Sequence, residues 1–429
     1  MKNKMVPLIL LLSALAVCTP TPPEPVEGLQ AFTGFRLIDG RGGSPIENTT
    51  MVVRDGRIEA VGAAAEVQIP PGATEIDLNG RTVTPGLIVT HGHVGMARGL
   101  ESGPQVNTPE NVMDQLRLYA RYGVTSVVSL GGDGDAGIQI ASQQEEAGFD
   151  YARLHVAGVT IEAQDPEETV RLVQENHARS VDFIKLRVDD QLGTVEKMTR
   201  TAYGPAITEA HKLGLKVAAH LYYLDDAKQL LDAGVDFLAH SIRDQAVDSE
   251  VIELLKETNV CITPTLTREL STYVYASEPE FFSDPFFTKA VDPAVLEQLK
   301  DPERQQSVAS NRAANLYQEG YPLAAQNLKA LADAGVRIAF GTDSGPAGRF
   351  QGYFEHLEMA MMADAGLTPA QILRSATSEA AACLGLGELG TLEAGKWADF
   401  VVLAEDPLAD VRNFRSLEAT WISGTQVRP

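Results

Sequence analysis

Residues 84–93 read TPGLIVTHGH, and this stretch contains the pattern that decides the fold. Its apolar run at residues 86–90 predicts a buried strand, and His91 and His93 follow where that strand ends. Residues two apart on a strand share a face, so both imidazoles can point at one metal. Alone, such a pair is weak evidence, because two exposed loop histidines give the same pattern. The rest of the chain therefore decides its meaning.

Strand-like apolar runs recur along the chain, and amphipathic stretches such as residues 166–180 separate them. The candidate strands cover residues 86–90, 125–131, 154–161, 182–186, 216–221, 237–241, 261–266 and 337–343. Continuous apolar runs indicate parallel strands covered on both faces. We therefore expect an α/β fold, a (β/α)8 barrel of the TIM type over residues 85–399. The longest insertion, residues 268–321, follows the seventh strand and is expected to be a lid or binding element.

Both ends of the chain carry short alternating strands broken by Gly and Pro. Asp55-Gly56 lies between two such strands and is a strong hairpin signal. Residues 400–429 return to strand-like runs after the barrel. We expect residues 29–84 and 400–429 to form one small β-sandwich domain.

Side chains that can bind metal fall at the ends of the predicted barrel strands. They are His91, His93, Lys185, His220, His240 and Asp343. A barrel of this kind places its chemistry at the C-terminal ends of its strands. Nitrogen and oxygen ligands collected there would hold one or two divalent metals, which indicates a metal-dependent hydrolase.

Two of these side chains suggest more specific chemistry. Lys185 would lie desolvated among histidines, which lowers the pKa of an amine. A neutral amine can take up carbon dioxide and form a carbamate with two oxygens able to bridge two metals. Asp343 ends the last strand, and a carboxylate beside a metal-bound water can accept its proton as the catalytic base.

The motifs HGH, FIK, AAH, LAH and FGTDSG, in this order, resemble the amidohydrolase superfamily in its binuclear subtype with a carboxylated lysine. The chain looks most like the imidazolonepropionase-like members, which include prolidases and Xaa-Arg or Xaa-Lys dipeptidases. The resemblance implies two divalent metals, which we expect to be zinc. In that arrangement His91, His93 and Asp343 bind the more buried metal, His220 and His240 bind the outer one, and carboxylated Lys185 bridges.

The resemblance also implies a reaction. A hydroxide bridging the metals attacks a carbonyl, and Asp343 passes its proton to the leaving amine. The expected substrate is a small molecule with an amide or peptide-like C–N bond, a dipeptide or N-acyl amino acid. Tyr222, Arg243 and Arg187 are the candidate substrate contacts, because they lie close after His220, His240 and Lys185.

Other functions remain alternatives. A lactonase or phosphotriesterase could use the same metal pair. A mononuclear deaminase is disfavoured, because Tyr223 stands three residues after His220, where such enzymes have a glutamate, and because Lys185 is present. A noncatalytic scaffold is disfavoured by the complete ligand set. The formal net charge of -23 argues against nucleic-acid binding, since an acidic surface repels phosphates. The sequence is compatible with a homo-oligomer.

The first 28 residues predict export. Residues 1–17 have the basic start and apolar run of a signal peptide. Residues 15–18 resemble a bacterial lipobox with Cys18 acylated, although residues 14–16 also suit ordinary cleavage. Residues 18–28 are Pro-rich and predict a stiff tether, so we expect a periplasmic protein or a membrane-anchored lipoprotein. Cys261 and Cys383 are expected to be buried free thiols, with no disulfide framework.

Overall fold

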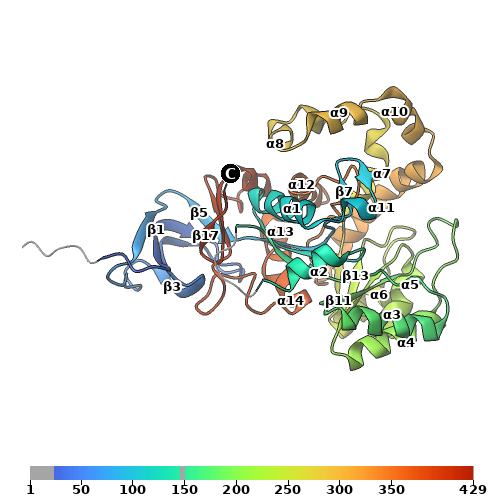
Figure 1. Cartoon of the computed structure of the whole chain (residues 1–429), viewed down its shortest axis with the longest axis horizontal. Helices are drawn as coiled ribbons and strands as arrows, with labels where there is room; N and C mark the ends of the chain where they lie inside the picture. The colour runs from blue at the N-terminus through green and yellow to red at the C-terminus, as the bar shows by residue number, and fades with distance from the viewer. Residues whose placement is uncertain (1–23, 145–149, 429) are drawn as a thin grey trace, which may run out of the picture.

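The computed structural model describes residues 24–144 and 150–428, a small β-rich domain beside a larger domain of strands and helices (Figure 1). The predicted signal peptide, Cys18 and the first part of the tether lie outside the described residues. Within those ranges, no helix has both the length and the apolar character needed to cross a membrane.

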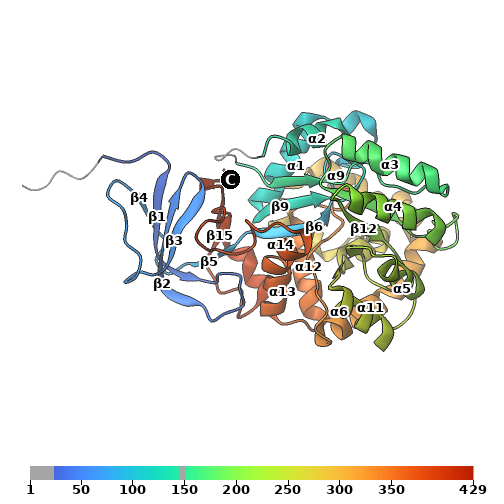
Figure 2. The same ribbon diagram turned by 90° about the horizontal axis from the view of Figure 1, so that it is seen from below.

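The small domain is built on one hydrogen-bonded sheet that takes strands from both ends of the chain. Its strands are β1 (Leu29–Leu37), β2 (Ile46–Arg54), β3 (Arg57–Ala63), β4 (Thr74–Asp77), β5 (Thr82–Pro85), β15 (Phe400–Leu403), β16 (Leu417–Ile422) and β17 (Thr425–Gln426). The order is β17-β16-β15-β5-β1-β2-β3, and β4 pairs with β1. Figure 2 shows the C-terminal strands beside the N-terminal ones. The predicted domain built from both chain ends is confirmed.

The larger domain contains parallel strands that follow the predicted positions closely. They are β6 (Leu87–Gly92), β9 (Val124–Ser129), β10 (Arg153–Val156), β11 (Phe183–Arg187), β12 (Lys216–His220), β13 (Phe237–Ala239) and β14 (Cys261–Thr263). Residues 338–344 take the eighth place, because Ile338 bridges to Ile262 of β14 and Ser344 bridges to Gly92 of β6. A bridge between Ile161 and Leu186 joins the two halves of the ring. The predicted TIM-type barrel is confirmed.

Helices alternate with these strands and cover the barrel. They are α1 (Pro109–Arg121), α2 (Asp135–Ala141), α3 (Pro166–Ala178), α4 (Arg200–Lys212), α5 (Leu224–Asp232), α6 (Ser249–Thr258), α11 (Arg312–Asp333), α12 (Tyr353–Asp364), α13 (Pro369–Ser375) and α14 (Ser378–Leu384). Local sequence fixes several of their starts. Asp165, for example, accepts hydrogen bonds from the backbone N–H groups of Glu167 and Glu168 and is followed by Pro166, the residue suited to a first helical turn.

The insertion after β14 is helical. It contains α7 (Leu266–Tyr273), α8 (Pro285–Thr288), α9 (Pro293–Leu299) and α10 (Pro302–Ala309), and Figure 1 shows α8, α9 and α10 at one edge of the barrel. Its aromatic side chains pack into a separate buried cluster with Tyr122, Tyr353 and Phe354. This packing holds the insertion against the barrel helices α1 and α12, and α7 leads directly from β14.

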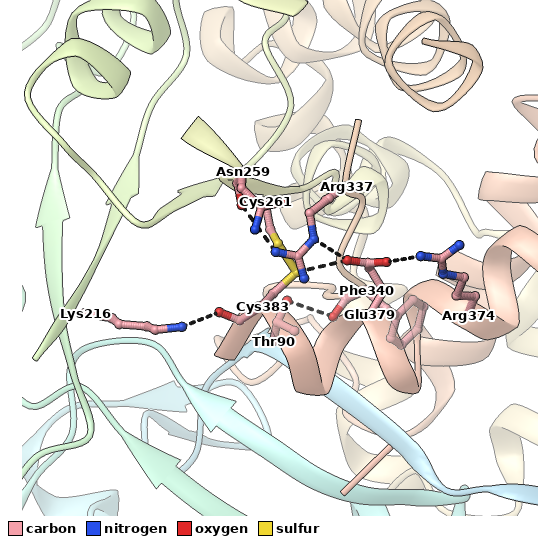
Figure 3. The surroundings of a disulfide bond; sticks show 9 residues. All are labelled: Thr90, Lys216, Asn259, Cys261, Arg337, Phe340, Arg374, Glu379 and Cys383. Carbon is pink, nitrogen blue, oxygen red and sulfur yellow. Dashed lines mark hydrogen bonds and ion pairs between the residues drawn. A yellow bond between two sulfur atoms is a disulfide. The ribbon is translucent and has the colours of Figure 1, made fainter. Parts of the chain in front are cut away.

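The expectation of free thiols is wrong. Cys261, at the start of β14, forms a disulfide with Cys383 of α14, and their Cα atoms are 6.0 Å apart (Figure 3). The two cysteines are 122 positions apart, which hides this pairing from the sequence, and it arises because α14 packs against the base of the barrel. Near the disulfide, Lys216 donates to the Cys383 carbonyl at 3.0 Å. The disulfide therefore ties a barrel strand to the last helix.

Candidate metal centre

One cavity of about 260 Å³ lies at the C-terminal end of the barrel strands. Its lining includes His91, His93, Lys185, His220, His240 and Asp343. His91 and His220 lie at strand ends, His93 and His240 directly follow β6 and β13, Lys185 lies within β11, and Asp343 lies in the segment that takes the eighth strand position. The structure thus brings together all the side chains that the sequence suggested as metal ligands.

The tightest group in this cavity is His91, His93 and Asp343. Asp343 Oδ1 lies 2.7 Å from His93 Nε2 and 3.4 Å from His91 Nε2. All three residues are buried, and their ligand atoms lie within 4.8 Å of one another. Asp343 has a left-handed backbone with φ of 57°. This group can hold a divalent cation.

A second pair of imidazoles completes the ring of nitrogens. The ring of His240 lies 4.3 Å from that of His220 and 4.6 Å from that of His91, measured between centroids. Lys185 is 4% exposed, and its Nζ has no hydrogen-bond partner among the described residues. Burying a charged amine without a hydrogen-bond partner costs free energy. The surroundings of Lys185 therefore suit a lysine that is modified or bound to a metal better than one that only stabilises the fold.

Three of the four imidazoles are anchored through a ring nitrogen, those of His93, His220 and His240. His93 Nδ1 donates to the Gly131 carbonyl at 2.9 Å, and His220 Nε2 donates to Asp189 at 2.7 Å. His240 Nδ1 lies 2.7 Å from Thr265 Oγ1. Such contacts fix the orientation and tautomer of a metal-binding imidazole. They leave His93 Nε2, His220 Nδ1 and His240 Nε2 as the lone-pair nitrogens of the centre.

Burial controls the charges of these groups. It lowers the pKa of His220 to about 3 and lowers the pKa values of His91 and His240 well below the usual range. It also lowers the pKa of Lys185 to about 7, against the opposing charge of Asp343. Neutral imidazoles and a neutral amine are the forms that can bind a metal or carbon dioxide.

A model of the amidohydrolase family matches residues 82–427. The chain belongs to the amidohydrolase family. An imidazolonepropionase from Deinococcus radiodurans is 25% identical over 374 residues, which are 83% of this chain and 86% of that protein. Metal ions are common in the family, and the His-His-Asp group is the candidate site for one here.

Two solved structures share the fold. A Xaa-Pro dipeptidase with methionine bound in its active site has a TM-score of 0.77 at 20% identity, and the match covers 94% of this chain and 100% of that one. Molinate hydrolase has a TM-score of 0.71 at 21% identity and covers 95% of each chain. The family match identifies the protein as a hydrolase of the amidohydrolase family, and the two structures show that it has the same fold.

The three predicted substrate contacts of this amidohydrolase lie in different places. Arg187 lines the cavity and forms an ion pair with Glu162 at 3.0 Å. Arg243 and Tyr222 are not among the described residues that line it. Arg243 is 2% exposed, donates to the Leu221 and Ser241 carbonyls, and lies over the Tyr222 ring at 4.6 Å.

Several residues of the site were not expected from the sequence. Arg268 and Arg349 line the cavity from the insertion and from the loop after residue 344. Asp189 accepts a hydrogen bond from His220 Nε2. Glu355 Oε1 accepts hydrogen bonds from Thr342 Oγ1 at 2.6 Å and from Ser344 Oγ at 2.7 Å, the residues directly before and after Asp343 in the chain. A carboxylate just past the fourth strand could have suggested Asp189. The sequence holds no comparable signal for the others, because they reach the site from loops and helices.

Proposed function

We propose that this amidohydrolase cleaves an amide or peptide-like C–N bond of a small molecule with two divalent metal ions. The observation that carries the proposal is the convergence of four imidazoles, Lys185 and Asp343 on one buried cavity. The described donors fit metal ions, because three of the four imidazoles are anchored through their outer nitrogens and the Lys185 Nζ has no other partner.

We assign one metal to His91, His93 and Asp343 and the other to His220 and His240. Lys185 would lie between them as a carbamate. Its neutral amine adds to the carbon of carbon dioxide, a C–N bond forms, one proton leaves, and the product carries one negative charge. When bound, the metals would polarise the carbonyl and lower the pKa of water.

The chain's own groups would then handle the proton. Asp343 is the carboxylate at the centre of the cavity, and its Oδ2 is held by Arg349 Nη1 at 2.5 Å. That contact fixes the plane of the carboxylate while Oδ1 faces His93. Asp343 would accept the proton of the attacking water and return it to the leaving amine. The Xaa-Pro dipeptidase among the structural relatives is consistent with cleavage of a C–N bond.

The test is a screen of the zinc-loaded protein against dipeptides and N-acyl amino acids, with lactones and phosphotriesters in parallel. We expect turnover of at least one amide, and a loss of about 100-fold or more in kcat/KM for the Asp343→Asn variant. Turnover of only lactones or phosphotriesters would contradict the proposed bond type. Inactivity of the metal-loaded protein on every class would contradict the enzymatic role.

We also propose that the protein is exported. The predicted signal sequence supports this, and so does the disulfide, because disulfides persist in oxidising compartments. The mass of the mature N-terminus, measured on protein from a bacterial host, tests the proposal. A lipidated Cys18 or a cleaved signal agrees with export, whereas an intact Met1 disagrees.

A further inference from the structure

The wall of the metal cavity is cationic. Arg187, Arg268 and Arg349 all line it. Among the described lining residues, Asp343 is the only carboxylate, and it is already assigned to a metal. A cavity that presents several guanidinium groups next to the reacting centre is suited to an anionic ligand.

Two of these arginines are rigidly built into the wall. The guanidinium of Arg268 lies 4.2 Å from the Tyr317 ring centre, and its Nη2 donates to Tyr317 Oη at 3.1 Å. Arg349 Nε donates to Ser271 Oγ at 3.0 Å, and Ser271 lies one helical turn after Arg268 on α7. Their side chains are only 11% and 18% exposed. Both guanidinium groups therefore face the cavity from fixed positions on neighbouring segments.

The charges around these arginines do not balance. Glu269 is shared, at 3.1 Å from Arg243 and 3.3 Å from Arg268. Arg349 pairs with Asp343, whose charge is also needed by the proposed metal. Two buried guanidinium groups and the partly buried one of Arg349 thus share two carboxylates. A buried cation without full compensation is costly, and an anionic group of the substrate would compensate it.

We propose that Arg268 and Arg349 bind a carboxylate of the substrate and so make the enzyme specific for amides that carry a free carboxylate near the scissile bond. This inference rests on the proposed function and names its substrate class. A guanidinium matches the two oxygens of a carboxylate in a bidentate pair, which gives orientation as well as affinity. The proposed binding site for the substrate carboxylate is thus formed by Arg268 and Arg349. Arg243 does not belong to it, because its guanidinium contacts backbone carbonyls and Glu269.

The main experiment compares matched substrates on the zinc-loaded enzyme. Each N-acetyl amino acid in a panel is paired with its carboxamide, which differs only in the charge of the terminal group. We expect the wild type to prefer the acids by about 10- to 100-fold in kcat/KM. The Arg268→Gln variant should lose most of this preference because kcat/KM falls for the acids, while kcat/KM for the carboxamides changes by less than about threefold. Arg349→Gln also removes the partner of Asp343, so it should lower kcat/KM for both members of each pair and, in addition, lower the ratio of acid to carboxamide. Arg374→Gln, an exposed arginine at the base of the barrel, is the matched control.

Equal kcat/KM for acids and carboxamides in the wild type would overturn the inference. The inference would also be overturned if the variants lowered kcat/KM equally for the acid and the carboxamide of each pair, because that pattern indicates a general loss of activity. Zinc content and the melting temperature report on folding. If a glutamine variant fails to fold, Arg268→Lys and Arg349→Lys are used instead. They keep the positive charge but lack the paired N–H donors of a guanidinium, so they should lose part of the preference for acids over carboxamides.

A binding measurement separates this inference from the proposed function. Calorimetric titration of the zinc-loaded protein with butanoate needs no turnover. We expect the glutamine variants to weaken butanoate binding about tenfold relative to the wild type and to Arg374→Gln. Butanoate binding that the arginines do not affect would overturn the inference. Arginine-dependent binding without hydrolysis of any amide would uphold the carboxylate site and contradict the proposed function alone.

Discussion

At the scale of the residue, the orientation of a cavity histidine depends on a neighbour that does not line the cavity. Asp189, at 2.7 Å from His220 Nε2, is 5% exposed and contributes no atom to the cavity lining. We expect the Asp189→Ala variant to bind zinc about 10- to 100-fold more weakly, because His220 loses the partner that fixes its ring. Competition with a chelator measures this affinity. Asp190→Ala is the control, since Asp190 contacts Tyr223 instead, and equal affinities in the two variants would contradict the role of Asp189.

The residues of the site were predictable to the extent that strands position them. His91, His93 and Lys185 could be placed because a strand end fixes where its next side chains point. Thr265 and Arg349 could not, because each acts from a loop whose path depends on tertiary packing. The prediction for Arg243 used nearness to His240 in sequence, but its side chain turns into the protein and reaches carbonyl groups.

A buried histidine outside the cavity gives a pH-dependent stability. Burial lowers the pKa of His356 to about 3 in the folded protein, from an ordinary value of 6.5. Between these values the unfolded chain binds the extra proton, so the free energy of unfolding falls as the pH falls below 6.5. From pH 6.5 to 5 the loss for one such group is about 2 kcal/mol.

Urea unfolding at pH 7 and pH 5 measures this contribution. The His356→Gln variant should lose about 2 kcal/mol less stability than the wild type between these pH values. His177, exposed on α3, is the control, and His177→Gln should keep the pH dependence of the wild type. Identical losses in the wild type and in His356→Gln would contradict the assignment.

At the scale of the element, the disulfide fastens β14 to α14. Cys261 lies at the start of β14, whereas Thr263, at its other end, accepts the backbone N–H of His240 at 3.0 Å. A double Cys261→Ala and Cys383→Ala variant should lose about 2–4 kcal/mol of stability. Melting temperatures with and without a reductant measure the effect. The double variant should not respond to the reductant, and a wild type that also does not respond would contradict a stabilising disulfide.

Elements were predicted best where sequence periodicity and burial agree. The apolar run at residues 86–90 overlaps β6, in which every residue is buried, and side chains such as those of Leu87, Ile88 and Val89 suit a strand covered on both faces. The insertion was expected only as a lid or binding element, without its helices. Its short helices α8 and α9 are set by Asp284 and Asp292, which cap them, and by packing of Phe287 and Val295 into the aromatic cluster.

At the scale of the whole molecule, a buried ion pair joins the barrel to the small domain. Arg153 of β10 donates to Asp399 at 2.6 Å, and Asp399 directly precedes β15 of the small sheet. Asp399 also accepts from the Ser423 backbone N–H at 2.8 Å. The Asp399→Ala variant should lose about 3–5 kcal/mol, because it leaves Arg153 buried without this carboxylate.

Chemical denaturation measures this loss against a surface pair. Glu59 pairs with Arg54 on the small domain, where both side chains are more than 40% exposed, so Glu59→Ala should cost about 1 kcal/mol or less. Similar losses for the two variants would mean that the Arg153–Asp399 pair does not join the domains. The sequence indicated that both chain ends share a domain, but the contact that attaches it to the barrel depends on side chains 246 positions apart.

The metal centre that we propose in the barrel is a pair of ions bridged by Lys185. The most direct test is the metal content of the protein after equilibration with zinc and bicarbonate, measured by mass spectrometry for the wild type and for Lys185→Ala. We predict about two zinc ions per chain in the wild type and about one or fewer in the folded variant. Two ions in both proteins would contradict the bridging role of Lys185. One ion or none in the wild type would contradict the binuclear centre itself.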